Sequence, residues 1–422
     1  MIESLTTKVL AIGDIGNIFH TIKKYAKSKI HVVNFYKDGA GVYTYADDVE
    51  TFQTYKVNDH VKRINEIKDN FDICITMGTG ERIAYLCDLN YAIFYVGNDI
   101  DAPRFLKNSK EPGFNEPLHK LNMFERWFYK NAFKNAIAHL AYAWVFEHLK
   151  KYTKNGIKLD VMPVDPTLFN SYVKPIDREK RKFTFFSPQR IGRPKGSDLI
   201  WKALSYCKSD FEILQVDWFE EATSEELIIK DELLRTKPPQ VTLVPMINRS
   251  DMPRYYTFAD AVIGNMRNGI YALIELEAAM CRRPVIQYTD PNMKIIAHGK
   301  EIKSPFLPTS NDPKIIAEVI DKVVTSEDFR KKLVEEQHKF VKEITDPEKI
   351  AAWWDSFFED LVKKHRSIRK KSPWIRTKLR CMFFLIANRL YFKKIKKVVT
   401  GSNYQKTGQT LYDLPRKTHF KE

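Results

Sequence analysis

Two basic side chains flank a loop near the middle of the sequence, in the stretch FFSPQRIGRPKGSDLIWKAL. Arg190 and Lys195 stand there between a predicted strand and a predicted helix. Fixed cations beside the first turn of a helix suit a diphosphate, because the helix end adds partial positive charge and free N–H groups. A solvated basic loop is the other interpretation. We take Arg190 and Lys195 as the first candidate catalytic groups.

A second candidate lies in NGIYALIELEAAMCRRPVIQY, where a glycine-led turn precedes an apolar helical segment. Glycine at 269 would let backbone amides approach an anion at the start of the helix. The residues whose amides would do so, and which we predict to bind a donor, are Gly269, Ile270, Tyr271 and Ala272.

Two glutamates lie inside this apolar segment, although a buried carboxylate is costly without a partner. Glu277 follows the turn by about two helical turns, where it could accept two hydrogen bonds from a ribose. Glu275 is two residues away and points elsewhere on the helix. We therefore predict Glu277 as the ribose ligand and Glu275 as a structural or surface acid.

A third candidate stretch, YAIFYVGNDID, ends a predicted strand of the first half. Asn98 and Asp99 would stand at the mouth of a cleft there, Asn98 toward the donor and Asp99 as a catalytic carboxylate. An ordinary Asn-Asp turn after the strand is the alternative.

The elements that would position these residues alternate between strand and helix patterns. Runs such as KVLAIGD, KIHVVNFY, FDICITMG and YAIFYVG are typical of buried strands, and helical patterns separate them. A polar linker near 173–182 precedes a second alternation from KFTFFSP to RPVIQY. The pattern predicts an α/β fold with two doubly wound Rossmann-like domains facing a cleft, 1–172 and 176–345. Residues 346–365 would form a helix that completes the first domain.

Charge is divided unevenly along the 422 residues. Residues 361–399 contain 14 Lys and Arg and no Asp or Glu, and residues 400–422 contain four basic and two acidic residues. The other 360 residues therefore hold 51 of the 69 basic and 51 of the 53 acidic residues. A neutral body with a basic tail at 366–422 disfavours a nucleic-acid partner, whose binding groove would be basic.

The five cysteines are scattered and lack the CxxC spacing of a zinc site. We expect reduced thiols, no metal site and a cytoplasmic location. No secretory signal precedes the first predicted strand.

Taken together, the three stretches resemble family 4 glycosyltransferases of the glycosyltransferase-B (GT-B) fold, over roughly residues 8–365. Arg190 and Lys195 keep the spacing of that family's GR-L-x-x-x-KG motif. Glu277 and Ala278, followed by Pro284 and Val285, match the second half of its E-x7-E-A-x5-P-V helix. The segments YYTFADAVIG and VMPVDPTLF resemble the regions that precede this helix and that approach the second domain.

The resemblance implies a nucleotide sugar as donor and no other cofactor. It implies a diphosphate held by Arg190 and Lys195, a ribose held by Glu277 and no required metal. The loop AIGDIGN occupies the place of the family's Gly-rich turn, so the resemblance adds three donor-binding candidates: Gly13, Gly16 and Asn17. The expected activity is transfer of a sugar with retention to a glycan or lipid-linked acceptor.

The sequence departs from the family pattern at three places. The first glutamate of the family helix falls on Gly269, the histidine before the first-domain G-S-D falls on Val96, and Arg282-Arg283 replace a small residue. These departures motivate a second hypothesis, a non-catalytic nucleotide- or glycan-binding protein on the same fold. A sugar-nucleotide epimerase is a third.

The basic tail contains WIRTKLRCMFFLIANRLYFKKIKKVV, from Trp374 to Val399. Its longest charge-free run has eight residues, whereas a membrane span needs roughly 20. We predict a helix on an anionic membrane surface, which would place the protein peripherally at the inner face of the membrane. A helix packed on the protein is the alternative. LNMFERWFYKNAFKN is a second candidate surface segment.

Overall fold

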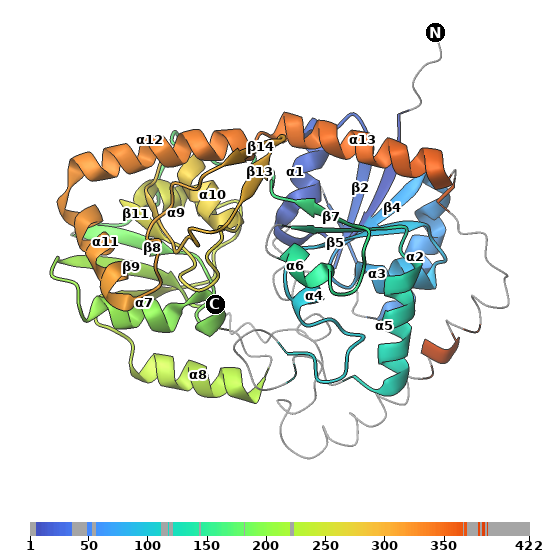
Figure 1. The fold of residues 1–422 in the computed structure, drawn as a ribbon, viewed down its shortest axis with the longest axis horizontal. Helices are drawn as coiled ribbons and strands as arrows, with labels where there is room; N and C mark the ends of the chain where they lie inside the picture. The colour runs from blue at the N-terminus through green and yellow to red at the C-terminus, as the bar shows by residue number, and fades with distance from the viewer. Residues whose placement is uncertain are drawn as a thin grey trace, which may run out of the picture. The chain divides into compact units, whose positions relative to one another are not determined.

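The chain folds into two α/β units, each built on a parallel sheet (Figure 1). The computed structural model describes residues 6–35, 49–52, 56–110, 117, 121–142, 145–180, 182–219, 223–365, 367–368 and five positions between 379 and 386. One unit runs to Leu159 and resumes at Glu348, and the other runs from Asp160 to Pro347. The predicted tail helix, Trp374–Val399, lies outside the described residues except at those five positions.

The first unit has a seven-stranded sheet in the order β3-β2-β1-β4-β5-β6-β7 with every described pairing parallel. Its strands read as near-continuous apolar runs because helices cover both faces of such a sheet. The strands are β1 (Lys8–Ile12), β2 (Lys29–Asn34), β3 (Glu50–Thr51), β4 (Ile73–Thr76), β5 (Tyr91–Tyr95), β6 (Ala138–Tyr142) and β7 (Gly156–Leu159). The helices are α1 (Ile18–Tyr25), α2 (Val57–Ile67), α3 (Gly80–Leu86), α4 (Asn98–Asp101), α5 (Met123–Asn135), α6 (Val145–Leu149) and α13 (Pro347–His365).

Helix α13 packs on the first unit, although it comes after the second unit in the sequence (Figure 1). The indole ring of Trp354 lies 5.6 Å from the ring of Phe19 in α1 and 5.5 Å from the ring of Phe94 in β5. The carboxylate of Asp355 accepts hydrogen bonds from the backbone amides of Lys27 and Ser28. Apolar packing and a buried carboxylate thus fix this helix beside α1.

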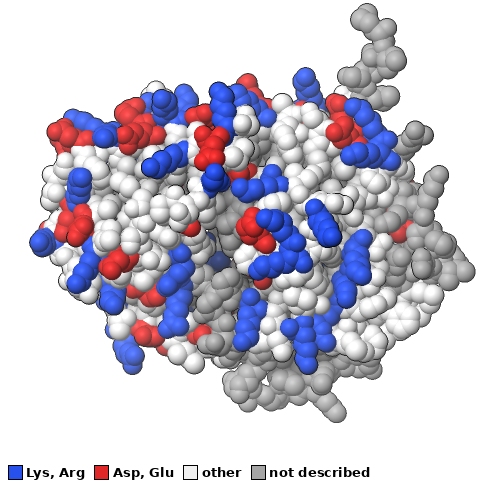
Figure 2. All heavy atoms as spheres, in the orientation of Figure 1, with Lys and Arg blue, Asp and Glu red and all other residues white. Residues whose placement is uncertain are grey.

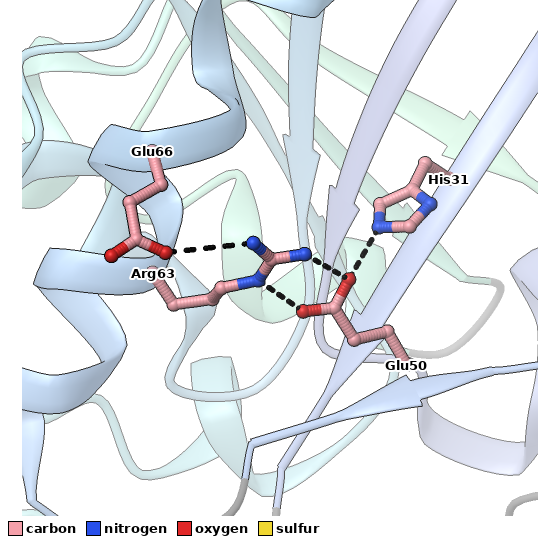
Figure 3. Close-up of polar contacts among 4 residues, drawn as sticks. All are labelled: His31, Glu50, Arg63 and Glu66. Carbon is pink, nitrogen blue, oxygen red and sulfur yellow. Dashed lines mark hydrogen bonds and ion pairs between the residues drawn. The ribbon is translucent and has the colours of Figure 1, made fainter.

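An ion-pair network links the edge strand β3 to strand β2 and helix α2 (Figure 3). Glu50 accepts two hydrogen bonds from Arg63 of α2, at 2.6 and 3.1 Å, and one contact of 2.8 Å from His31 of β2. The Arg63 guanidinium lowers the pKa of Glu50. A two-residue strand pairs with few backbone groups, so this bidentate ion pair supplies part of its attachment.

The second unit has a five-stranded parallel sheet in the order β10-β9-β8-β11-β12. The predicted fold class, two doubly wound α/β domains, is confirmed. The strands are β8 (Phe183–Ser187), β9 (Phe211–Val216), β10 (Val241–Val244), β11 (Ala261–Ile263) and β12 (Val285–Ile286), with a separate antiparallel hairpin of β13 (Ile295–Ala297) and β14 (Lys300–Ile302). The helices are α7 (Ser197–Leu204), α8 (Ser224–Arg235), α9 (Met252–Phe258), α10 (Leu273–Met280), α11 (Pro313–Thr325) and α12 (Glu327–Ile344).

The segment after β7 belongs to the second unit because of its hydrogen bonds. The Asp160 carbonyl accepts from the Tyr271 hydroxyl at 3.2 Å, and the Asp160 carboxylate accepts from the Ile296 amide at 3.0 Å. The division therefore falls at Asp160, ahead of the polar linker that the sequence pattern marked at 173–182.

Acidic and basic side chains are mixed along α12 and α13 (Figure 2). Several form pairs one helical turn apart, such as Lys331 with Glu327 and Lys363 with Glu359. Among the described residues no helix is both long enough and apolar enough to cross a membrane. The four cysteines that the structure describes, Cys74, Cys87, Cys207 and Cys281, are free thiols.

Candidate functional site

The loops that carry the predicted residues of the second unit meet at one point of its sheet. Strands β8 and β11 are neighbours, but the chain leaves β8 toward β9 and leaves β11 toward β12. Where the strand order reverses in this way, the two loops at the carboxyl edge diverge and leave room for a ligand. Arg190 and Lys195 follow β8, and the turn at Gly269 follows β11. The fold thus brings the first two candidate stretches together.

Direct contacts hold these two loops against each other. The Met266 amide donates to the Lys195 carbonyl at 3.1 Å. The Arg267 guanidinium binds both carboxylate oxygens of Asp198 at 2.7 Å. Gly196 has a φ of +75°, and a Cβ there would lie 2.9 Å from the Met266 side chain. The loops are therefore positioned as one structure rather than as two independent segments.

The two candidate cations differ in their surroundings. The Arg190 guanidinium lies 5.5 Å from the centre of the Trp218 ring, an arrangement that orients it. Lys195 ends a short 3-10 turn just before α7. Burial raises the pKa of Glu275, and the positive charge of Lys195 opposes that increase. Both cationic side chains are half-buried, so their charges are less screened than those of a solvated loop.

Glu275 is a structural acid, and the surface alternative is wrong because the residue is fully buried. Its two carboxylate oxygens accept hydrogen bonds from the backbone amides of Asn265 and Ala272, at 2.9 and 2.8 Å. Burial raises the pKa of Glu275, and these hydrogen bonds oppose the increase. The carboxylate fixes the loop between β11 and α10. It also uses the Ala272 amide, one of the groups predicted to face a donor.

Glu277 has a charged partner that the sequence pattern did not reveal. Its side chain is 1% exposed and forms an ion pair with Arg249, whose side chain is 9% exposed. The Arg249 guanidinium also lies 5.4 Å from the centre of the Phe169 ring. Arg249 comes from the segment between β10 and α9, and nothing in its local sequence links it to Glu277. This pairing explains how the apolar helix accommodates a second acid.

The side chains of Ile270 and Tyr271 belong to the core, being 4% and 2% exposed. The Tyr271 ring packs on the rings of Phe306 and Phe340. Only the backbone of these two residues is therefore suited to contact a donor.

Gly269, which the sequence pattern aligned with the first glutamate of the family 4 helix, has a backbone geometry that leaves no room for a side chain. Its φ is +67°, and a Cβ would lie 2.8 Å from the Cβ of Asp290 and 3.0 Å from the Tyr288 ring. The Asp290 amide also donates to the Gly269 carbonyl at 2.9 Å. A side chain at 269 would require this packing to move.

Gly269→Ala is expected to lower the free energy of unfolding by about 1–3 kcal/mol, measured by chemical denaturation. Two other glycines separate the causes. Gly299 also has a positive φ, +80°, but open space around its Cβ position, and Gly97 has open space without a positive φ. We expect the loss of unfolding free energy to be largest for Gly269→Ala, smaller for Gly299→Ala and smallest for Gly97→Ala. Equal losses at 269 and 299 would contradict the packing argument.

The predicted glycine-rich loop of the first unit also lies at a reversal of strand order, between β1 and β4. Gly13 and Gly16 have φ values of +83° and +70°. Asn17 is 1% exposed, and its side-chain oxygen and nitrogen have no hydrogen-bond partner among the described residues. The adjacent helix end is satisfied instead by Asp14, which accepts from the amides of Phe19 and His20. A buried amide side chain without a partner is the kind of group that a ligand satisfies.

Asp99 lies at the carboxyl end of β5 beside a second acid, Glu81, which the sequence analysis did not select. One carboxylate oxygen of each residue is buried and accepts no hydrogen bond among the described residues. Burial raises the pKa of Asp99 to about 7. A hydrogen bond from the Gly97 amide and the positive charge of Arg104 oppose this increase, and the negative charge of Glu81 adds to it. Burial likewise raises the pKa of Glu81. Asp99 can therefore take up or release a proton near neutral pH, beside the buried carboxyl group of Glu81. Asn98 begins the short helix α4, and its side chain lies outside the described residues.

This pair predicts a pH-dependent difference in stability. The folded protein holds a proton on Asp99 up to about pH 7, whereas the unfolded chain releases it near pH 4. The parent should therefore lose stability relative to Asp99→Asn as pH rises from about 4 to 7. Urea denaturation across this range measures the difference. Glu81→Gln should move this loss of stability to lower pH, because it removes a negative charge that raises the pKa of Asp99. A pH-independent difference would contradict the raised pKa.

Comparison with known proteins agrees with this architecture. Residues 170–340 match the family model of glycosyl transferases group 1. No curated protein matches the sequence. Among solved structures, sucrose-phosphate synthase from Thermosynechococcus elongatus is similar with a TM-score of 0.61 and 14% identity, covering 85% of this chain and 100% of that one.

Two further solved structures show the same likeness. HepE of Anabaena, in complex with UDP and glucose, has a TM-score of 0.59 and 14% identity, covering 84% of this chain and 100% of its own. A glycosyltransferase from Rickettsia africae has a TM-score of 0.56 and 16% identity, covering 85% of this chain and 99% of its own. At these identities the likeness shows the fold, and the family match supports glycosyltransferase activity. Residues 170–340 match the group 1 glycosyltransferases, and the chain around them has the GT-B fold.

Proposed function

We propose that this protein transfers a sugar from a nucleotide-sugar donor to a glycan or lipid-linked acceptor, with retention and without a required metal. One observation carries the proposal. Arg190 and Lys195 lie where the strand order of the second sheet reverses, inside the segment that matches the group 1 glycosyltransferases. The complexes of HepE with UDP and with UDP-glucose, on the same fold, support a nucleotide sugar as the donor.

The chemistry follows from where charge develops during transfer. As the bond between the sugar and the diphosphate breaks, negative charge grows on the departing phosphate oxygens. Two preorganised cations stabilise that charge more strongly in the transition state than in the ground state. Arg190 and Lys195 would thus stabilise the leaving group without a metal ion.

The second unit would hold the rest of the donor. The resemblance to family 4 enzymes supports Glu277 as the ribose ligand, and the ion pair with Arg249 would orient that carboxylate. The backbone around Gly269, Ile270 and Tyr271 would lie against the phosphates or the sugar. Glu275 would act as a positioning residue, because its carboxylate binds two backbone amides of this loop.

The first unit would bind the acceptor and one side of the donor. The buried side-chain amide of Asn17 has no hydrogen-bond partner in the part of the chain that the structure describes, so Asn17 and the glycines before it are suited to hydroxyl groups. Burial raises the pKa of Asp99 to about 7 and also raises the pKa of Glu81, so Asp99 with Glu81 beside it would suit proton transfer from an acceptor hydroxyl.

Incubation with a panel of nucleotide sugars and separation of the products tests the proposal. Transfer or slow donor hydrolysis supports it. Binding of a nucleotide sugar without turnover on any acceptor would favour the non-catalytic alternative. An isomerised nucleotide sugar formed without acceptor would favour an epimerase.

We also propose that the basic tail, Trp374–Val399, contacts an anionic membrane surface, with the protein at the cytoplasmic face. The 14 basic and zero acidic residues of 361–399 support this assignment. Flotation on anionic vesicles compares the full chain with a chain that ends at Lys371. Equal flotation of the two proteins would remove the membrane role of the tail.

A further inference from the structure

Helix α5 exposes apolar side chains on a face that usually carries polar residues. Asn122 and Glu125 form a capping box that fixes the start of the helix. The buried face consists of Glu125, Phe128, Tyr129 and Ala132. On the other side Met123, Phe124 and Trp127 are 65%, 62% and 54% exposed. Such a concentration of exposed rings within the first two turns needs a physical reason.

The helical residues 382–384 pack beside this helix (Figure 1, red segment next to α5). The rings of Phe128 and Phe384 lie 4.3 Å apart, and both residues are buried, at 4% and 5% exposure. Around this contact the segment exposes further large apolar side chains: Leu379 at 44%, Met382 at 48%, Phe383 at 55% and Ile386 at 45%. The two segments singled out separately in the sequence therefore meet through one pair of rings.

The exposure is concentrated in these two segments. Of the 16 large apolar side chains that are exposed in the described part of the chain, seven belong to them. We call these seven residues, with Lys130 and Lys134, the α5 surface. Both lysines are exposed and lie one and two turns beyond Trp127 on the same side of the helix.

Charge decides which partner this surface fits. Arg126, Lys130 and Lys134 are the charged residues of α5 besides Glu125, and Glu125 is buried in the capping box. The chain that continues past residue 386 adds five basic residues and no acid up to Val399. Exposed aromatic and aliphatic groups next to cations match a bilayer with anionic headgroups, where rings enter the interface and lysines meet phosphates.

We propose that the α5 surface docks on an anionic lipid bilayer. The tail then acts together with a folded helix of the first unit and is not the sole membrane contact. This inference rests on the proposed membrane role and extends it, and it is independent of the proposed sugar transfer. It places the first unit, which carries Asp99 and Asn17, next to the membrane surface.

Vesicle flotation of full-length variants tests the proposal. We expect Phe124→Ser/Trp127→Ser to partition about tenfold more weakly than the parent into vesicles containing phosphatidylglycerol. Lys130→Glu/Lys134→Glu should weaken binding to these vesicles by a similar factor, and its loss should disappear at high salt. The parent and both double variants should bind only weakly to pure phosphatidylcholine vesicles.

The matched control is Ile228→Ser/Leu234→Ser on α8 of the second unit, whose side chains are 68% and 39% exposed. This variant should float like the parent. Nucleotide binding and the unfolding temperature should stay unchanged in all the variants, because the altered side chains are exposed. Unchanged flotation of Phe124→Ser/Trp127→Ser would overturn the proposal while leaving the tail assignment and the sugar transfer standing.

A second outcome would identify another partner. If the parent forms a dimer in sedimentation analysis and Phe124→Ser/Trp127→Ser is a monomer that floats normally, the α5 surface joins two copies of the chain. That result would also overturn the docking proposal. If the parent itself fails to float on anionic vesicles, both membrane assignments fall and the transferase proposal stays testable by its products.

Discussion

The substitutions Arg190→Ala and Lys195→Ala are each expected to lower kcat/KM for a nucleotide sugar by about 10²- to 10³-fold. Each side chain would contribute a fixed positive charge at the leaving diphosphate, in a half-buried site where water screens it weakly. The loss should fall mainly on kcat, because the charge on the diphosphate grows in the transition state. Initial rates over a range of donor concentrations measure both parameters.

Arg193→Ala is the matched control for these variants. Arg193 lies in the same loop but is exposed, so its removal should change kcat/KM little. Nucleotide affinity, measured separately by calorimetry, should also fall in Arg190→Ala and Lys195→Ala. If affinity and turnover both stay at parental values, the diphosphate site is wrongly assigned, although another part of the protein could still transfer sugar.

Glu277→Ala and Arg249→Ala are each expected to lower the free energy of unfolding by about 3–5 kcal/mol. Either change leaves one buried charge without its partner, since the two side chains are only 1% and 9% exposed. The double variant Arg249→Met/Glu277→Leu should lose much less than the sum, because no unpaired charge is left. Chemical denaturation of the four proteins completes a double-mutant cycle.

An exposed ion pair provides the control for this cycle. Arg282 and Glu335 pair at 2.7 Å with exposures of 45% and 68%, so Glu335→Ala should cost no more than about 1 kcal/mol. The folded double variant also separates stability from binding. If Glu277 holds the ribose, Arg249→Met/Glu277→Leu should fold and bind nucleotide weakly. Normal nucleotide binding would leave the ion pair with a structural role alone.

Local sequence patterns predicted the elements well where residues of one kind follow each other. Buried runs such as ICIT and YAIFY became β4 and β5, because a parallel sheet covered on both faces selects continuous apolar strands. The patterns missed the two-residue strand β3 and the hairpin of β13 and β14. These pieces depend on tertiary contacts, such as the network around Glu50, more than on their own propensity.

The site was predicted only in part for a similar reason. A glutamate three residues after a helix start is a local signal, and it could have identified Glu275 as a capping residue. No local signal could identify Arg249 as the partner of Glu277 or Glu81 as the neighbour of Asp99. Those pairs form only when segments that are separate in the sequence come together in the folded chain.

By itself the sequence determined two α/β domains, the loops that carry Arg190, Lys195 and Gly269, and a neutral body with a basic tail. These properties depend on periodicity, composition and residues close together along the chain. The tertiary structure alone decided that Glu275 also binds the Asn265 amide, that Glu277 is neutralised by Arg249, and that Gly269 has no room for an acid. The physical reason is that the free energy of a buried charge or a crowded backbone depends on the residues that surround it in space. The order of residues along the chain does not identify those neighbours.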